Sequence, residues 1–254
     1  MEQASNDSKR TILITGAGSG FGRGAAVKLA QLGHRVIGGV ISEDEAQSLR
    51  AEGVEAIKLD ITDEADLAEA AKLDVDVLLN NAGRGQLGPL ATVPIDDVRQ
   101  VFEVNVFGTL RVTQAMLPAM QKRGSGRIII VSSIAGISSG ALSGPYAMTK
   151  HSLEAMTKSL RVEMEHYGIE VCKLNPGPYA TGFNDAMVDG VQPMMTEDPV
   201  HQNLNESTRT RMLGNQLDPV EIIDTMVELC TAETVPFETF KPDNILERYG
   251  LPAR

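Results

Sequence analysis

The chain has 254 residues, of which 42% are hydrophobic and 22% are charged, a composition usual for a soluble α/β protein with one sizeable core. Its formal net charge of −11 argues against a nucleic-acid partner, because binding to phosphates requires a basic surface. Its two cysteines, Cys172 and Cys230, form no disulfide framework, so we expect a cytoplasmic protein.

Targeting segments, membrane spans and metal sites are also disfavoured. Residues 1–10 are polar, so we expect no secretory signal. The longest aliphatic run, residues 128–131, is far shorter than the about 20 residues that cross a membrane. The four histidines show no metal-ligand spacing, so we expect no metal site.

Short aliphatic runs alternate with helical stretches along the chain. Such runs are typical of strands that are covered on both faces, so the pattern predicts a doubly wound, mostly parallel sheet in three α/β/α layers. We expect strands at residues 11–14, 35–40, 54–59, 75–79, 127–131 and 169–174. We expect a single domain over residues 1–254.

Helical periodicity fills the gaps between these strands. It is clearest at residues 95–122 and 146–166, and further helices are expected at residues 25–32 and 219–230. Pro118 falls late in the first long helix, and we expect it to kink that helix or to end a turn.

The pattern weakens between residues 181 and 218, where four residues interrupt it: Gly182, Gly190, Pro193 and Pro199. We expect an irregular or mobile insertion over the sheet edge that helps to recognise the substrate. Three methionines gather there, at Met187, Met194 and Met195, and fit either loop packing or the lining of an apolar pocket. The tail after Thr231 shows no assignable element.

A glycine-rich stretch, residues 15–22, lies between the first strand and the helix that follows. Gly16, Gly20 and Gly22 permit a tight turn and a close approach of the backbone to a pyrophosphate. The start of the helix then offers free N–H groups and a positive dipole end to the phosphates. The stretch therefore predicts a dinucleotide-binding loop.

The choice between NAD and NADP depends on the end of the second strand, where an acidic residue would bind the ribose 2′-hydroxyl of NAD. Val40 and Ile41 occupy that place, and no arginine or lysine follows to hold the 2′-phosphate of NADP. Glu43 and Asp44 come next and would repel such a phosphate. This balance favours NAD, while Arg23, just past the loop, keeps NADP open.

Tyr146 and Lys150 stand one helical turn apart and so share a helix face. A fixed ammonium stabilises a phenolate, so we expect Lys150 to lower the pKa of Tyr146 and make the phenol a usable acid or base. Together with a dinucleotide loop, this pair predicts hydride chemistry on an alcohol or a carbonyl. Taken alone, such a pair is usually a packed ring beside a solvated cation, so the prediction depends on the joint occurrence of the motifs.

With these motifs in order, the chain resembles the one-domain form of the short-chain dehydrogenase/reductase family from about residue 11 to residue 181. Residues 15–22 fit the family's Thr-Gly-x-x-x-Gly-x-Gly loop, and residues 80–83 match its Asn-Asn-Ala-Gly signature. The resemblance assigns a catalytic tetrad of Asn105, Ser133, Tyr146 and Lys150. It assigns cofactor contacts to Gly16, Ser19, Gly20, Phe21, Gly22, Asp60, Ile61, Asn81, Ala82, Gly83, Tyr146, Lys150, Pro176, Gly177 and Thr181.

The resemblance implies a Rossmann fold and hydride transfer between nicotinamide C4 and a carbonyl or carbinol carbon. Tyr146 would exchange the oxygen-bound proton, Ser133 would hydrogen-bond the substrate oxygen, and Lys150 would hold the nicotinamide ribose. Asn105 would hold a water that links Lys150 to solvent. Residues 20–22 and 176–181 are similar to the retinol and hydroxysteroid dehydrogenase branch, which favours a bulky apolar substrate.

Two other functions are compatible with the same fold: a non-catalytic dinucleotide-binding regulator, and an enzyme such as an enoyl reductase or an epimerase. The intact Ser133, Tyr146 and Lys150 speak against a regulator. Enoyl reductases usually space the tyrosine and lysine more widely, and epimerases usually carry a longer substrate domain. The segment between Asp60 and Asn80 is short for the family, so we expect its helix to be trimmed.

The family also pairs its two long helices between subunits. Both helices carry apolar residues on more than one face here: Val101, Val104, Phe107, Leu110, Leu153, Met156 and Leu160. We therefore expect a homodimer or homotetramer that acts on a small-molecule alcohol or ketone.

Overall fold

A computed structural model describes residues 9–191 and 199–252. Within them, seven strands form one sheet in the order β3-β2-β1-β4-β5-β6-β7, and every neighbouring pair is parallel. The strands are β1 (Thr11–Thr15), β2 (Arg35–Val40), β3 (Glu55–Lys58), β4 (Val77–Asn80), β5 (Gly126–Val131), β6 (Ile169–Pro176) and β7 (Glu238–Lys241). The six expected strands are thus confirmed, while β7 comes from the unassigned tail.

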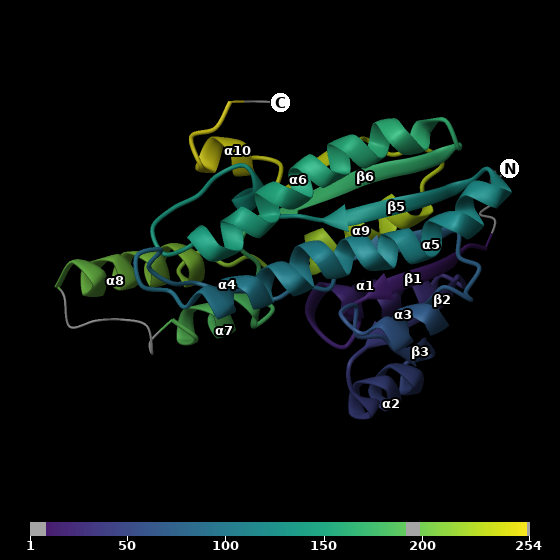
Figure 1. Cartoon of the computed structure of the whole chain (residues 1–254), viewed down its shortest axis with the longest axis horizontal. Helices are drawn as coiled ribbons and strands as arrows, with labels where there is room; N and C mark the ends of the chain where they lie inside the picture. The colour runs from purple at the N-terminus through teal and green to yellow at the C-terminus, as the bar shows by residue number, and fades with distance from the viewer. Residues whose placement is uncertain (1–8, 192–198, 253–254) are drawn as a thin grey trace, which may run out of the picture.

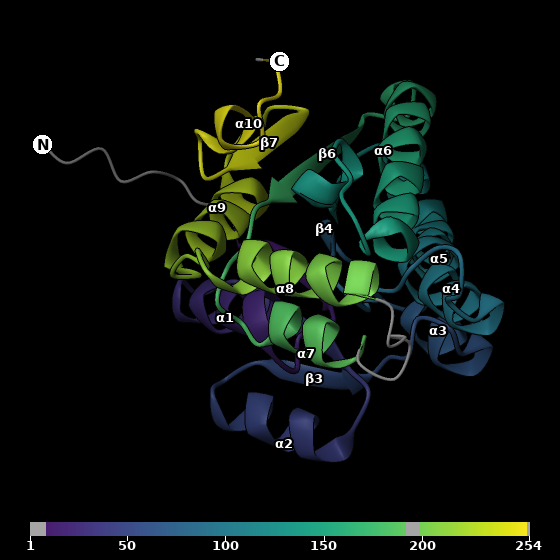
Figure 2. The same cartoon turned by 90° about the vertical axis from the view of Figure 1, so that its left-hand side faces the viewer.

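The aliphatic runs form strands because both faces of the sheet are covered. Leu78 and Leu79 are adjacent on β4 and fully buried, but they pack into different cores, since successive side chains point to opposite faces. One core includes residues of α1 (Gly20–Gln31), α2 (Glu43–Ala51) and α9 (Val220–Thr231). The other includes residues of α3 (Glu64–Ala70), α5 (Thr109–Arg123) and α6 (Gly144–Glu165) (Figures 1 and 2). The expected doubly wound fold and the short α3 are confirmed.

The long helix expected at residues 95–122 is confirmed, but it is not α-helical throughout. It consists of α4 (Ile95–Phe102), a π-helical turn (Glu103–Gly108) and α5. Single π-helical turns inside α-helices often occur at functional sites, and this one contains the fully buried Asn105. Pro118 lies inside α5, which continues to Arg123, so this proline does not end the helix.

The expectation of an irregular insertion at residues 181–218 is wrong for the described part. This part folds into α7 (Phe183–Asp189) and α8 (Pro199–Leu213), which lie beyond the carboxyl ends of the strands (Figure 2). The residues interpreted as interruptions are the ends of these helices, since Gly182 precedes α7, Gly190 follows it and Pro199 begins α8. Pro193, Met194 and Met195 lie outside the described residues.

The tail completes the sheet with β7 and then forms α10 (Ile245–Arg248). Lys173 on β6 is fully buried and forms ion pairs with Glu154 on α6 and Glu238 on β7. These pairs join the last strand to the layer of α6. Among the described helices, none has both the length and the apolar character needed to cross a bilayer.

Candidate active site

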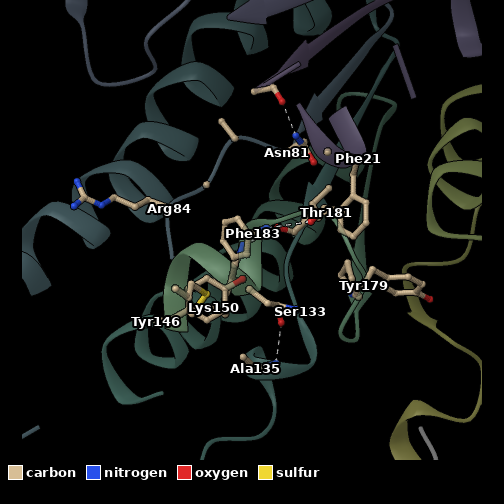
Figure 3. A pocket seen from close by; sticks show the side chains of 18 of the residues that line it. Phe21, Asn81, Arg84, Ser133, Ala135, Tyr146, Lys150, Tyr179, Thr181 and Phe183 are labelled. Atoms are coloured by element: carbon tan, nitrogen blue, oxygen red, sulfur yellow. Dashed lines mark hydrogen bonds between the residues drawn. The ribbon is translucent and has the colours of Figure 1, made fainter. Parts of the chain in front are cut away.

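A cavity of about 820 Å³ runs along the carboxyl ends of the strands. The cavity spans the place where the strand order reverses, because β2 and β3 lie on one side of β1 and β4 to β7 follow on the other. Doubly wound sheets bind ligands at such a point. The glycine-rich loop lines one end, and Ser133, Tyr146 and Lys150 line the other (Figure 3).

The glycine-rich loop needs its glycines for conformation and for space. Gly16 and Gly20 have φ values of +64° and +53°, a region that other residues rarely adopt. A Cβ on Gly22 would lie 2.4 Å from the carbonyl oxygen of Gly16. Gly22 therefore packs against the back of the loop, while Gly16, Ser19, Gly20 and Phe21 line the cavity; the contact of Gly22 with a cofactor stays a prediction.

The start of α1 has the properties of an anion site. Its N-cap residue, Ser19, makes no side-chain capping hydrogen bond, and the first turn contains no acidic residue. By contrast, α2 begins with a complete capping box and three acidic residues. The first N–H groups of α1 thus keep their capacity to bind phosphate oxygens, and the loop fits the pyrophosphate of a dinucleotide.

The loop after β4 is tied to the glycine-rich loop. The backbone N–H groups of Asn81 and Ala82 both donate to the Thr15 hydroxyl at 3.0 Å. The Asn81 side chain donates to the Gly16 carbonyl at 3.0 Å. These bonds hold Asn81, Ala82 and the neighbouring Gly83 in the cavity wall.

Asp60 and Ile61 follow β3 at the same end of the cavity as the glycine-rich loop. The Asp60 carboxylate accepts from the backbone N–H and the hydroxyl of Thr62, at 2.9 and 2.7 Å. Ile61 is 4% exposed and fills the space beside Gly108. Both predicted residues thus line the cavity in fixed positions.

Glu45 also lines this end, although the sequence analysis did not select it. It is the third residue of α2, and its Oε2 accepts from the backbone N–H groups of Ile41 and Ser42 at 3.1 and 3.3 Å. The bond from its own N–H to Ser42 Oγ completes the capping box. A Cβ on Gly18 would lie 2.4 Å from Glu45 Oε1, so this carboxylate stands against the glycine-rich loop. In the sequence, the Ser-x-x-Glu spacing of a capping box is the feature that could have indicated Glu45.

Arg23 lies beside the same loop but is already engaged. It donates to the Ser48 hydroxyl at 2.9 Å and forms an ion pair with Glu52, both on or next to α2. Its remaining contact is a 3.5 Å bond to the Gly18 carbonyl. This arginine connects α1 to α2 in the observed structure.

The segment after β6 closes the middle of the cavity. Pro176, Gly177 and Thr181 all line it, as expected. A Cβ on Gly20 would lie 3.5 Å from the Thr181 side chain, so this segment faces the glycine-rich loop directly. Phe21 and Tyr179 meet edge to face across the gap, with ring centroids 5.7 Å apart.

Ser133, Tyr146 and Lys150 gather at the other end (Figure 3). Ser133 follows β5, and its Oγ accepts from the Ala135 N–H at 3.1 Å and shares a hydrogen bond with the Tyr146 side chain. Lys150 Nζ lies 5.5 Å from the centroid of the Tyr146 ring and donates to the Val131 carbonyl at 3.0 Å. The three predicted residues are therefore brought together.

Burial controls the protonation of this pair. Burial raises the pKa of Tyr146 well above its usual value, and the hydrogen bond with Ser133 opposes this only in part. Burial likewise lowers the pKa of Lys150 to about 8, against the opposing charge of Glu154. The causes of the raised Tyr146 pKa are burial and, opposing it, the hydrogen bond with Ser133, so the expectation that Lys150 lowers the pKa of Tyr146 stays a prediction.

Asn105 does not line the cavity but stands behind its wall. Its Oδ1 accepts from the Arg84 N–H at 2.7 Å, and its Nδ2 donates to the Arg84 carbonyl and the Thr149 hydroxyl at 2.9 and 3.0 Å. Both amide hydrogens are thus taken by protein oxygens. The Asn105 side chain thus ties the loop at Arg84 to Thr149, the neighbour of Lys150, and the expected bridging water stays a prediction.

A buried polar network lies next to Lys150, on the side away from the cavity. Glu154, one turn further along α6, accepts from Ser132 and Asn175, each at 2.7 Å, and pairs with Lys173. Burial alone would raise the pKa of Glu154, but these partners lower it below its usual value. The Glu154 carboxylate thus stays charged beside Lys150.

The outer part of the cavity is apolar. Phe183 and Met187 of α7 and Met212 of α8 line it, and the Phe183 and Tyr146 rings lie 5.9 Å apart. Met187 is 5% exposed, so it serves both in packing and in lining the cavity. A second cavity of about 690 Å³ adjoins the first and shares Phe183 and Met187 with it. No group of three or more His, Cys, Asp or Glu side chains among the described residues could hold a metal ion.

Comparisons with known proteins agree with this geometry. Residues 10–192 match the family model described as short chain dehydrogenase. The uncharacterized oxidoreductase YusZ of Bacillus subtilis is 33% identical over 89% of this chain and 86% of its own length. Human retinol dehydrogenase 8 is 32% identical over 75% of this chain and 65% of its own length.

Solved structures show the same likeness. The crystal structure of a short-chain dehydrogenase from Streptomyces avermitilis superposes with a TM-score of 0.82 and 31% identity, over 94% of this chain and 91% of that one. The family model, the relatives and the solved structure all agree on one family. This chain belongs to the short-chain dehydrogenase/reductase family of oxidoreductases, which bind NAD(P).

Proposed function

We propose that this protein is an NAD(P)-dependent alcohol dehydrogenase or carbonyl reductase that interconverts a secondary alcohol and a ketone. The observation that carries the proposal is the meeting of Ser133, Tyr146 and Lys150 in the cavity that also contains the glycine-rich loop. A regulator that only sensed a dinucleotide would need the loop but no proton donor beside it.

The chain's own groups have distinct tasks in this reaction. A bound nicotinamide supplies or accepts the hydride. The hydroxyls of Ser133 and Tyr146, which share a hydrogen bond, can together hold one substrate oxygen between them. The raised pKa of Tyr146 keeps its phenol protonated, which is the form that gives a proton to a ketone oxygen. Lys150 holds the ribose next to the nicotinamide. Asn105 is a positioning residue for the part of the cavity wall beside Lys150.

The structure favours NAD over NADP in this proposal. Glu45 Oε2 is bound by two backbone N–H groups, which leaves Oε1 against Gly18 as an acceptor for a ribose hydroxyl. A 2′-phosphate there would meet the charge of Glu45 and no unengaged arginine, because Arg23 pairs with Glu52. Glu45 thus supplies from α2 the acidic group that is missing at the end of β2.

We further propose a bulky substrate with an apolar body. Phe183, Met187 and Met212 offer it an apolar wall, and methionine side chains adapt to irregular shapes. The similarity to retinol dehydrogenase 8 supports this substrate class. These side chains come from α7 and α8, in the described parts of the segment expected to recognise the substrate.

The test is a spectrophotometric assay of nicotinamide reduction and oxidation, with secondary alcohols and ketones of increasing size and with both cofactors. We expect turnover with apolar ketones and higher kcat/KM with NADH than with NADPH. Tyr146→Phe keeps the ring beside Phe183 but removes the proton donor, so turnover should fall by about a hundredfold or more. Cofactor affinity, measured by the fluorescence of bound NADH, should stay nearly the same.

Two outcomes would contradict the proposal. Tight NADH binding without turnover across the panel would favour the regulator. Activity of the Tyr146→Phe variant at the wild-type level would exclude Tyr146 as the proton donor.

A further inference from the structure

Charged side chains divide the main cavity into two halves. Among the described residues that line it, the acidic ones are Glu45 and Asp60, both at the end of the glycine-rich loop. The basic ones are Arg84, Lys150 and Arg211, but the Arg84 side chain points away from Tyr146 and bonds Gln100 (Figure 3). Lys150 and Arg211 are therefore the cations of the half that contains the catalytic hydroxyls.

Arg211 is the basic residue of this cavity that has neither a catalytic role nor a side-chain partner described so far. Lys150 belongs to the catalytic group, and Arg84 donates to the Gln100 side chain at 3.0 Å. Arg211 Nη2 donates to the Ala141 carbonyl at 3.3 Å, and no carboxylate within residues 9–191 and 199–252 forms an ion pair with it. Arg211 is exposed, and a guanidinium has five N–H donors, so most of those on Arg211 face water and can turn to a ligand.

Its position connects this cation to the catalytic residues. Arg211 extends from α8 over the loop that joins the turn of Ser133 to the helix of Tyr146. It crosses this loop at Gly140, where an added Cβ would lie 1.9 Å from Arg211 Nη1. Ser138, Ser139 and Gly140 line the same cavity. The guanidinium therefore stands over the loop that runs between the two catalytic hydroxyls.

Phe183, Met187 and Met212 give the substrate half an apolar wall, beside the serines of the loop at Gly140. A wholly apolar ligand would remove Arg211 from water and leave its donors unpaired, which is unfavourable. A carboxylate would instead accept two parallel hydrogen bonds from the guanidinium and match its single charge.

We propose that the substrate is an apolar oxo or hydroxy carboxylic acid whose carboxylate is bound by Arg211. This inference rests on the proposed function, because it places the C–O group between Ser133 and Tyr146. In the reductive direction the ketone carbon gains the hydride and its oxygen gains the Tyr146 proton, so the carboxylate is chemically unchanged.

The first test compares oxodecanoic acids, with the ketone at successive positions, against their methyl esters. We expect the wild-type protein to prefer the best acid over its ester by about tenfold or more in kcat/KM. Arg211→Gln should abolish this preference, and Arg211→Lys should keep part of it. Gly140→Ala should weaken it as well, because the new methyl group displaces the guanidinium without removing its charge.

The matched control is Arg209→Gln on the same helix. Arg209 pairs with Asp189 at 3.5 Å and does not line the cavity, so the preference for the acid should survive this change. An equal kcat/KM for acid and ester in the wild-type protein would overturn the inference. So would a preference that persists in Arg211→Gln.

A binding experiment separates this inference from the proposed function. Calorimetry of the NADH complex with decanoate and with decanol should show tighter binding of decanoate, and the difference should vanish in Arg211→Gln. If no ketone is reduced but decanoate binds through Arg211, the oxidoreductase proposal fails and the anion site stands. If neutral ketones are reduced and decanoate binds no better than decanol, the anion site fails alone.

Discussion

At the scale of single residues, the cavity contains a charged group whose burial opposes folding. Lys150 is 5% exposed, and its pKa of about 8 lies well below that of a lysine in water. Its hydrogen bond to the Val131 carbonyl and the charge of Glu154 compensate this desolvation only in part. The protein thus keeps a lysine that is useful for binding but unfavourable for stability.

Lys150→Met should therefore raise the melting temperature at neutral pH. Below about pH 8 the lysine is charged in both the folded and the unfolded chain, so the full penalty, on the order of 3 kcal/mol, applies before the lost hydrogen bond is subtracted. Between about pH 8 and about pH 10 only the unfolded chain holds the proton, so wild-type stability recovers as pH rises. Thermal unfolding of both proteins across this range is the measurement, and a difference that does not change with pH would contradict the argument.

The role of Glu45 in cofactor preference can also be tested with single substitutions. Glu45→Gln removes the charge from the adenosine end, so the preference for NADH over NADPH should fall about tenfold, in both kcat/KM and dissociation constant. Gly18→Ala should act in the same direction, because its methyl group would displace the Glu45 carboxyl group. Glu43→Gln is the control, since Glu43 is exposed and pairs with Arg50 at 2.8 Å. An unchanged ratio in Glu45→Gln would remove Glu45 from cofactor selection.

At the scale of elements, one buried lysine joins three of them. Lys173 on β6 holds Glu154 of α6 and Glu238 of β7, and the Lys173 side chain is fully buried. The same Glu154 lies one turn from Lys150, so the ion pairs that join β7 to the sheet also support the catalytic end of the cavity.

Lys173→Met should be among the most destabilising single substitutions in this chain. It leaves the Glu154 and Glu238 carboxylates without their shared cation, which costs about 3–5 kcal/mol for a buried pair. Chemical denaturation measures the loss. The exposed Lys158 on α6 provides the control, and Lys158→Met should change the stability by less than about 0.5 kcal/mol. Equal effects of the two substitutions would show that the buried network contributes little.

The sequence allows some of these elements to be predicted and hides others, for physical reasons. Strands β4 and β5 contain continuous aliphatic runs, and the spacing of Tyr146 and Lys150 is local, so both are visible in the sequence. Strand β7 is Glu-Thr-Phe-Lys and is recognisable only through its pairing with β6. The bonds of the Asn105 side chain to Arg84 join residues that are distant in sequence, so they are hidden from a sequence pattern. Arg211 reaches the cavity only because α8 crosses the loop at Gly140.

At the scale of the whole molecule, the predicted assembly depends on the outer surfaces of the long helices. Several of the apolar residues in that prediction belong to the chain's own core, since Val101, Leu153 and Leu160 are buried. Phe107 remains 48% exposed, and Val162 on α6 is 63% exposed. These two residues are the apolar contacts that pairing of the long helices would cover.

A homodimer or homotetramer remains our prediction for the protein in solution. Light scattering should give a mass of two or four chains, and Phe107→Glu with Val162→Glu should reduce it to that of one chain. Leu32→Glu, an exposed position after α1 on the opposite layer, should leave the mass unchanged. A wild-type protein with the mass of one chain would refute the prediction.

The double use of Glu45 has an evolutionary consequence. The same carboxylate caps the first turn of α2 and faces the nucleotide loop. A lineage that exchanged this side chain for a basic one, to accept the phosphorylated coenzyme, would keep the Ser42 cap but lose the Glu45 half of the capping box, at a cost of about 1 kcal/mol. Drift between the two coenzymes should therefore require a compensating change near Ser42, so that the two positions would vary together among descendants of this protein.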